Sequence, residues 1–163
     1  LFDVTRCSRT KSAGPPCACT RKPSNRVIVR FSSARLGRIA TLKSFGDQVT
    51  FLRMGEGYTW ETQDRERDTH CAQQAWAKVC EFLRDPSYAM VVLDEFNIAL
   101  QHGYVVLDDV LPVLRNRPPM QHVVITGRGG PAEILEEADL VTEMKQVKHP
   151  FRNGIKAQPG VEF

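Results

Sequence analysis

A run of four consecutive apolar side chains, residues 90–93, predicts the central strand of this chain. Uninterrupted apolar runs of this length are typical of strands that are buried on both faces, as in a parallel sheet covered by helices. Two acidic residues, Asp94 and Glu95, follow the run directly. Ligands of open α/β sheets bind at the carboxyl ends of the strands, so we expect both carboxylates to lie at a ligand-binding edge. The alternative is an acidic strand-to-loop junction without chemistry.

Helical and strand patterns alternate along the rest of the chain. Apolar positions recur at helical spacing between residues 64 and 84, and Asp85-Pro86 ends that pattern. Further helices are expected at residues 96–102, at residues 108–114 and from Pro131, which favours the first helical position. Further strands are expected at residues 27–31, 48–54, 121–125 and 138–141. This alternation indicates a parallel α/β sheet.

Length and composition are those of one globular domain. The chain has 163 residues, of which 42% are hydrophobic and 25% are charged, as in ordinary soluble domains. No apolar run approaches the roughly 18 residues that a membrane span requires. We therefore expect a cytoplasmic protein without membrane association.

Charge is distributed unevenly along the chain. Residues 1–46 carry ten Lys or Arg against one acid, a net charge of +9, whereas the whole chain has a net charge of only +3. Residues 1–26 also lack a hydrophobic period, and we expect them to be disordered. A basic segment of this kind indicates a nucleic-acid-binding arm, a targeting peptide or a segment that is foreign to the fold. Without interleaved aromatic residues, nucleic-acid binding is the least favoured of these.

The five cysteines do not form a recognisable framework. Cys71 and Cys80 lie nine positions apart in one predicted helix, where two thiols cannot easily pair. Cys17 and Cys19 have no second pair at zinc-finger spacing. The sequence therefore favours neither a disulfide scaffold nor a zinc site.

An unusual loop is expected at residues 54–65, MGEGYTWETQDR. Two glycines permit a tight backbone, and Tyr58 and Trp60 place two large rings in a loop beside the expected ligand edge. Such rings can wedge against a flat ligand. The alternative is that both rings pack on the neighbouring helix.

Six segments together carry a resemblance to a known family. They are MGEGYTWETQDR, DPSYAMVVLDEFNIAL, MQHVVITGRG, EADLVTEM, VKHPF and GIKAQPGVEF. In this order and spacing, the chain closely resembles the ATP:corrinoid adenosyltransferases from about residue 45 to residue 163.

The resemblance implies a P-loop, RecA-like α/β fold, a homodimer, and the use of ATP, Mg²⁺ and a corrinoid. The implied reaction is attack of the corrinoid's Co(I) on the 5′ carbon of ATP with release of triphosphate. It also implies an electron donor such as a reduced flavoprotein, with neither nucleic acid nor a membrane as partner. The alternative is a non-catalytic corrinoid-binding or dimerising relative that has lost ATP binding.

The resemblance also assigns residues to the two substrates. Tyr58 and Trp60 match the aromatic pair that displaces the corrinoid's lower axial ligand; the first is usually Phe, so the Tyr58 hydroxyl needs a partner. Asp94 and Glu95 match the acidic end of the Mg²⁺-binding strand. The remaining expected substrate-binding residues are Glu56, Arg128, Lys148 and Lys156. For Arg128 the alternative is a solvated turn arginine, and His149 is expected to be structural.

One family motif is missing from these 163 residues. The P-loop has the form GxxxxGK[ST], and the nearest string, GRIATLKS at residues 37–44, has Leu42 where the second glycine belongs. We therefore expect residues 44–163 to form the adenosyltransferase domain. Residues 1–43 are expected to be foreign to the family through a frameshift or a mistaken gene assignment, with a targeting segment as the competing explanation. A chain of this kind is expected to be poorly stable.

Overall fold

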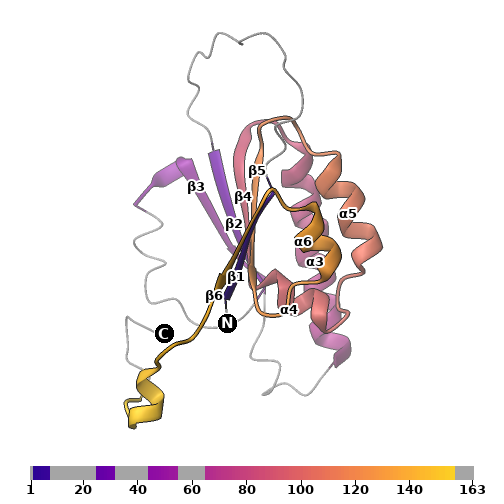
Figure 1. Cartoon of the computed structure of the whole chain (residues 1–163). Helices are drawn as coiled ribbons and strands as arrows, with labels where there is room; N and C mark the ends of the chain where they lie inside the picture. Colours follow the sequence, from indigo (N-terminus) through magenta and orange to yellow (C-terminus); the bar gives the residue numbers. More distant parts are fainter. Residues whose placement is uncertain (1, 8–24, 32–43, 55–64, 157–163) are drawn as a thin grey trace.

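Among the residues that the structure describes, six strands form one mixed sheet in the order β3-β2-β4-β5-β1-β6 (Figure 1). The computed structural model describes residues 2–7, 25–31, 44–54 and 65–156. Strands β3, β2, β4 and β5 run parallel, whereas β1 runs antiparallel to both of its neighbours. The strands are β1 (Phe2–Cys7), β2 (Asn25–Arg30), β3 (Val49–Arg53), β4 (Tyr88–Asp94), β5 (His122–Gly127) and β6 (Leu140–Met144). The predicted α/β fold with a parallel central sheet is therefore confirmed.

The expected helices are present near the predicted positions. They are α3 (Arg65–Arg84), α4 (Phe96–Gln101), α5 (Leu107–Arg115) and α6 (Ala132–Glu137), with short 3-10 turns η1 (Gly46–Gln48) and η2 (Pro150–Asn153). The prediction for Pro131 was wrong by one position. Pro131 has an extended ψ of 145° and occupies the N-cap of α6, so the first helical residue is Ala132.

The two faces of the parallel strands are buried to different extents. Val91 and Leu93 are fully buried, whereas Met90 and Val92, which alternate with them, are only partly buried. Figure 1 shows α3, α5 and α6 on the same side of the sheet, and their apolar residues share one core with Val91 and Leu93. The expectation that residues 90–93 are buried on both faces is therefore wrong, because the described helices cover one face.

Helix α3 and the start of α4 are joined by aromatic packing. Trp76 on the apolar face of α3 stacks on Phe96, with ring centroids 5.3 Å apart. Phe31, which follows β2, packs on the same ring at 4.7 Å. Phe96 is fully buried and immediately follows Glu95. This aromatic cluster therefore anchors the chain where β4 passes into α4.

Part of the segment that was expected to be disordered forms strands. Residues 2–7 form β1, which pairs with β5 on one side and β6 on the other. Because both neighbours supply backbone hydrogen bonds, this strand does not depend on a hydrophobic period of its own. Strand β2 lies between β3 and β4, so the expected boundary between residues 43 and 44 falls between two adjacent strands of one sheet.

Two expectations from composition can be compared with the described residues. Cys71 and Cys80 do not form a disulfide with each other, which confirms that they do not pair. Within the described ranges, none of the helices is both long enough and apolar enough to cross a membrane.

Candidate functional site

Asp94, the last residue of β4, is held from both neighbouring strands. Its Oδ1 accepts a hydrogen bond of 2.9 Å from the hydroxyl of Thr126 on β5. Its Oδ2 lies 3.5 Å from Nη1 of Arg30, the last residue of β2. Both carboxylate oxygens therefore have a partner, and three adjacent parallel strands meet at this side chain.

Glu95 is held in an unusual backbone conformation. It has φ 62° and ψ 21° at the N-cap of α4, a left-handed geometry that costs a residue other than glycine on the order of 1 kcal/mol. Its backbone N–H donates to Oγ1 of Thr126 at 3.0 Å. The Thr126 hydroxyl thus fixes Asp94 through its side chain and Glu95 through its backbone.

The electrostatic surroundings of Glu95 disfavour its ionised form. Burial raises the pKa of the Glu95 carboxyl, and the adjacent charge of Asp94 raises it further. The positive charges of Arg30 and Arg128 oppose both effects. A cation brought to this edge of the sheet would therefore be attracted by the carboxylate and would favour its ionisation.

The turn that carries Arg128 packs closely on the first turn of α4. A Cβ at Gly127 would lie 3.0 Å from Cβ of Asn97, and one at Gly130 would lie 3.1 Å from Nδ2 of Asn97. Gly127 also has φ 128°, which glycine adopts without strain. Asn97 is fully buried and donates a long hydrogen bond of 3.5 Å to the carbonyl of Gly127. These contacts explain the glycines at positions 127 and 130 of this turn.

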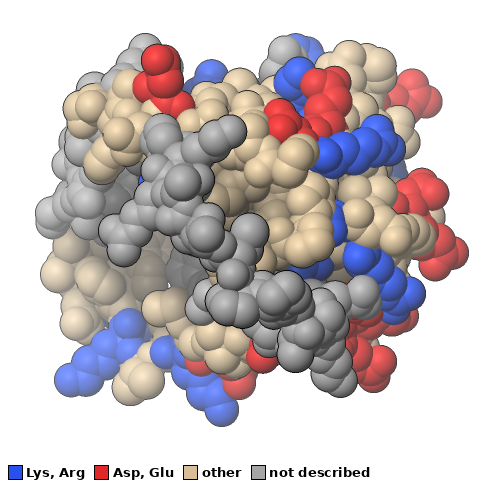
Figure 2. All heavy atoms as spheres, turned by 90° about the horizontal axis from the view of Figure 1, so that it is seen from above, with Lys and Arg blue, Asp and Glu red and all other residues tan. Residues whose placement is uncertain are grey.

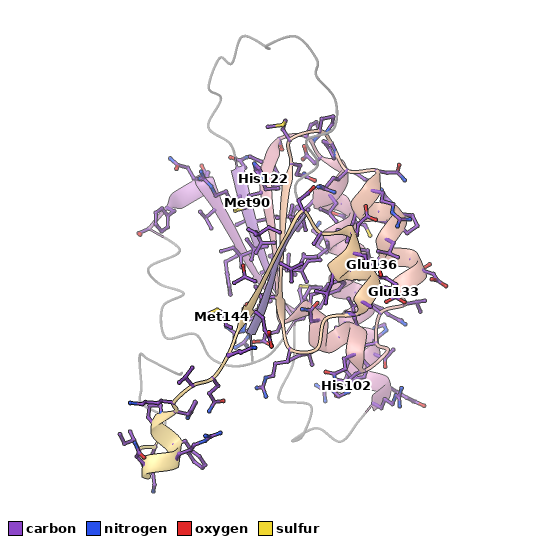
Figure 3. The ribbon with its side chains drawn as sticks, viewed as in Figure 1. Met90, His102, His122, Glu133, Glu136 and Met144 are labelled. Carbon is purple, nitrogen blue, oxygen red and sulfur yellow. The ribbon has the colours of Figure 1, made fainter. Side chains whose placement is uncertain are left out.

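The site lies at one end of the sheet. Figure 3 labels Met90 and His122, register partners near the starts of β4 and β5, at the upper end of these strands. Helix α4, which begins directly after Glu95, lies at the lower end in Figure 1. The acidic pair and the Arg128 turn therefore occupy the carboxyl ends of the strands, where ligands bind in open α/β sheets.

The remaining predicted site residues lie apart from this cluster or outside the described ranges. Lys148 and Lys156 are exposed and flank η2, which stands away from the sheet in Figure 1. Glu56, Tyr58 and Trp60 lie outside the described residues, as does most of the GRIATLKS string. His149 accepts a hydrogen bond from the Phe151 backbone N–H at 3.2 Å, so its contact is a structural one.

Sequence reasoning missed Arg30, Thr126 and Asn97. Arg30 lies in the basic N-terminal segment, and Thr126 was considered only as part of a turn. The signal that identifies them is strand order, because β2 and β5 flank β4 and all three strands end at the same edge. Asn97 follows the acidic pair by two positions and points back beneath the turn of β5.

The donor set at this edge fits a magnesium ion only in part. Among the described residues, no group of three or more His, Cys, Asp or Glu could hold a metal. Mg²⁺ usually retains several waters and is bound by one or two carboxylates together with substrate phosphates. Asp94 and Glu95 therefore supply the one or two carboxylates of such a site, and waters or substrate phosphates would complete the coordination.

Comparison with known proteins gives one family match. A family profile described as ATP:corrinoid adenosyltransferase BtuR/CobO/CobP matches residues 18–163, which confirms the resemblance seen in the motifs. The match begins upstream of residue 45, where the motifs placed its start, and includes β2.

Individual relatives are similar over most of this chain. The corrinoid adenosyltransferase of Pseudomonas aeruginosa is 53% identical over 138 residues, which cover 83% of this chain and 68% of the relative. The corrinoid adenosyltransferase of a Sinorhizobium species is 48% identical over 151 residues, which cover 92% of this chain and 68% of the relative. The corrinoid adenosyltransferase CobA of Salmonella typhimurium is 44% identical over 115 residues, which cover 71% of this chain and 59% of the relative.

Proposed function

This chain belongs to the ATP:corrinoid adenosyltransferase family, and from that premise we propose that it transfers the 5′-deoxyadenosyl group of ATP to the Co(I) of a corrinoid in adenosylcobalamin biosynthesis. The family match over residues 18–163 carries this conclusion. The charged cluster of Arg30, Asp94, Glu95 and Arg128 at the carboxyl edge supports it. Such an edge can accept the phosphates of a nucleotide.

The proposed reaction is a nucleophilic displacement. The electron pair of Co(I) forms a bond to C5′ of ATP while the C5′–O5′ bond breaks, and that bond's electron pair leaves with triphosphate. Cobalt is formally oxidised to Co(III), and no general base is needed at the carbon. The protein must therefore orient the two reactants and stabilise the charge that develops on the departing triphosphate.

On the phosphate side, we assign Arg128 to the nucleotide. Arg128 is exposed on the Gly-rich turn beside Glu95, where its guanidinium can donate to phosphate oxygens. Glu56, Lys148 and Lys156 are proposed as further substrate-binding residues on the basis of the family motifs alone. Asp94 and Glu95 are proposed to hold Mg²⁺, which supplies neutralising charge for the leaving group when bound.

On the corrinoid side, we assign Tyr58 and Trp60 to the lower face of the corrin ring. Two apolar rings there displace the lower axial ligand and make the reduction of Co(II) to Co(I) easier. The proposal further includes an electron donor such as a reduced flavoprotein, and a homodimer as the active form. The excess of basic residues in positions 1–46 is not assigned a nucleic-acid contact, and nucleic acid is not proposed as a partner.

The direct test is the anaerobic conversion of chemically reduced cob(I)alamin to light-sensitive adenosylcobalamin by the purified chain, with and without ATP and Mg²⁺. Formation of adenosylcobalamin and triphosphate in equal amounts is expected only when ATP is present. Corrinoid binding without any ATP binding would instead favour a non-catalytic corrinoid-binding relative.

Two versions of the assay, one started from cob(I)alamin and one from cob(II)alamin, separate the role of Trp60 from that of the residues that bind the phosphates of ATP. Trp60→Ala should retain activity with prereduced cob(I)alamin and lose it when the assay starts from cob(II)alamin with a reductant. Phe45→Ala is the matched control, since Phe45 is an exposed aromatic side chain just before η1, near the amino end of β3. Equal loss of activity from both cobalt states would contradict the assigned role of Trp60.

A further inference from the structure

The contacts around Asp94 distinguish the two neighbouring carboxylates. We propose that Asp94 is held by Arg30 and Thr126 and serves as an anchoring carboxylate, whereas Glu95 binds the divalent cation. The charge of Arg30 then determines how tightly the cation binds. This inference rests on the proposed function, because it concerns the metal site of that reaction. It refines the assignment of both acids to Mg²⁺ by giving Asp94 and Glu95 different roles.

The first step of the argument is that Asp94 already has a partner on each oxygen. Thr126 donates to Oδ1 at 2.9 Å, and the Arg30 guanidinium lies 3.5 Å from Oδ2. A metal that bound Asp94 directly would have to displace one of them. The Arg30 side chain is only 13% exposed, so solvent screens its charge less than that of a surface arginine.

The second step is that, among the described residues, the recorded hydrogen bond of Glu95 to Thr126 is made by its backbone. The Thr126 hydroxyl accepts the Glu95 backbone N–H at 3.0 Å, and the left-handed φ of 62° sets the direction in which Glu95 leaves the strand. Within the described ranges, no hydrogen bond or ion pair to the Glu95 carboxylate is present. Its oxygens can therefore bind a cation without displacing a group that belongs to the described residues.

The third step concerns the charge of Arg30. A guanidinium beside Asp94 repels a metal ion that approaches the adjacent Glu95. Removing the charge should therefore tighten cation binding, whereas loss of a merely structural residue would weaken it or leave it unchanged. A gain of affinity is thus specific to the proposed role.

The test is a titration of the purified full-length chain with Mn²⁺ alone, followed by electron paramagnetic resonance of the free ion. Arg30→Gln should bind Mn²⁺ roughly tenfold more tightly than wild type, within the range expected for removing one nearby charge. Arg30→Lys should stay near wild type because it keeps the charge. Glu95→Gln should abolish binding, and Asp94→Asn should weaken it by less than Glu95→Gln does.

Arg53→Gln is the matched control. Arg53 is the register partner of Arg30 on β3, one strand further from Asp94, and it is exposed. The same loss of charge at this position should leave Mn²⁺ affinity within about twofold of wild type, since exposed charges at longer range are largely screened.

Three results would overturn the inference. They are unchanged or weaker binding by Arg30→Gln, loss of binding by Asp94→Asn with normal binding by Glu95→Gln, and absence of Mn²⁺ binding by every variant. Assay of adenosyl transfer on the same preparations separates this inference from the proposed function. If the wild type transfers adenosyl but the variants do not show the expected Mn²⁺ affinities, only the inference is contradicted. If the variants show the expected Mn²⁺ affinities but the wild type transfers no adenosyl, only the proposed function is contradicted.

Discussion

The two ends of strands β4 and β5 each contain a buried carboxamide. At the amino end, Gln121 is 4% exposed and its Nε2 lies 3.0 to 3.1 Å from the carbonyl oxygens of Phe82, Asp85 and Tyr88. At the carboxyl end, Asn97 is fully buried and makes one hydrogen bond of 3.5 Å to Gly127. The first amide ties the end of α3 to the start of β4, whereas the second supports a turn that carries a functional side chain.

Charged side chains are present at both ends. Figure 2 views the molecule from above, and Lys, Arg, Asp and Glu side chains are intermixed over its right-hand side. At the carboxyl end, Arg30 pairs with Asp94, and the charges of Asp94, Arg30 and Arg128 act on Glu95. The amino end thus contributes mainly to stability, while the carboxyl end retains polar groups for a ligand. Substitutions at the two ends should therefore have separable effects.

The largest effect on stability is expected for Gly127→Ala at the carboxyl end. The new Cβ would lie 3.0 Å from Cβ of Asn97, and alanine disfavours φ 128°. Steric overlap and backbone strain together should lower the free energy of unfolding by about 3 kcal/mol, measured by urea denaturation. Gly103→Ala is the control, because Gly103 has φ 68° but a Cβ added there would meet no atom within 4 Å. Equal losses for the two variants would contradict the close packing of turn and helix.

At the amino end, Gln121→Ala should lower the free energy of unfolding by about 2 kcal/mol. The substitution leaves three carbonyl oxygens without their shared donor. Mn²⁺ affinity and adenosyl transfer by the folded protein should be unchanged, since Gln121 lies at the opposite end of the strands. Gln73→Ala on the exposed side of α3 is the control for loss of a glutamine. A change in Mn²⁺ affinity would show that the two ends are coupled.

Thr126→Val should have a moderate effect on stability and a larger one on the site. It removes the hydroxyl that serves Asp94 and Glu95, at a cost of about 1 kcal/mol in unfolding free energy. Groups that orient metal ligands typically contribute 10-fold to 100-fold to metal affinity or activity, and a loss of that size is expected in both assays. Thr126→Ser keeps the hydroxyl and should restore most of the loss. Failure of serine to restore function would argue against the hydrogen bonds as the cause.

The smallest effect on stability is expected for Glu95→Gln, which should stabilise the folded protein slightly. Because the pKa of Glu95 is raised in the folded protein, folding disfavours its ionised form. That penalty is absent below the ordinary pKa of 4.5 and is complete above the raised pKa. Glu95→Gln should therefore melt at a slightly higher temperature than wild type near pH 8, and the difference should shrink as the pH falls towards 4.5. A difference that is independent of pH would contradict this origin.

Local patterns predicted most of the elements because those elements depend on neighbours in sequence. The apolar positions of α3, among them Trp76 and Val79, recur at helical spacing, and both are buried as that spacing requires. The run before Asp94 is a strand at the centre of the sheet, and its acidic end lies at the expected edge. The family motifs are also properties of the sequence alone, and the family match confirmed them.

Contacts between distant segments depended on the fold. Strand β1 lies in a segment whose composition predicted disorder, and it is paired with β5 on one side and β6 on the other. Arg30 lies in a segment read as foreign to the fold, yet strand order brings it to Asp94. The sequence alone could reveal Asp94 and Glu95 as an acidic pair, because the two residues are consecutive. The partners that distinguish one acid from the other come from different strands, and only pairing of those strands brings their side chains together.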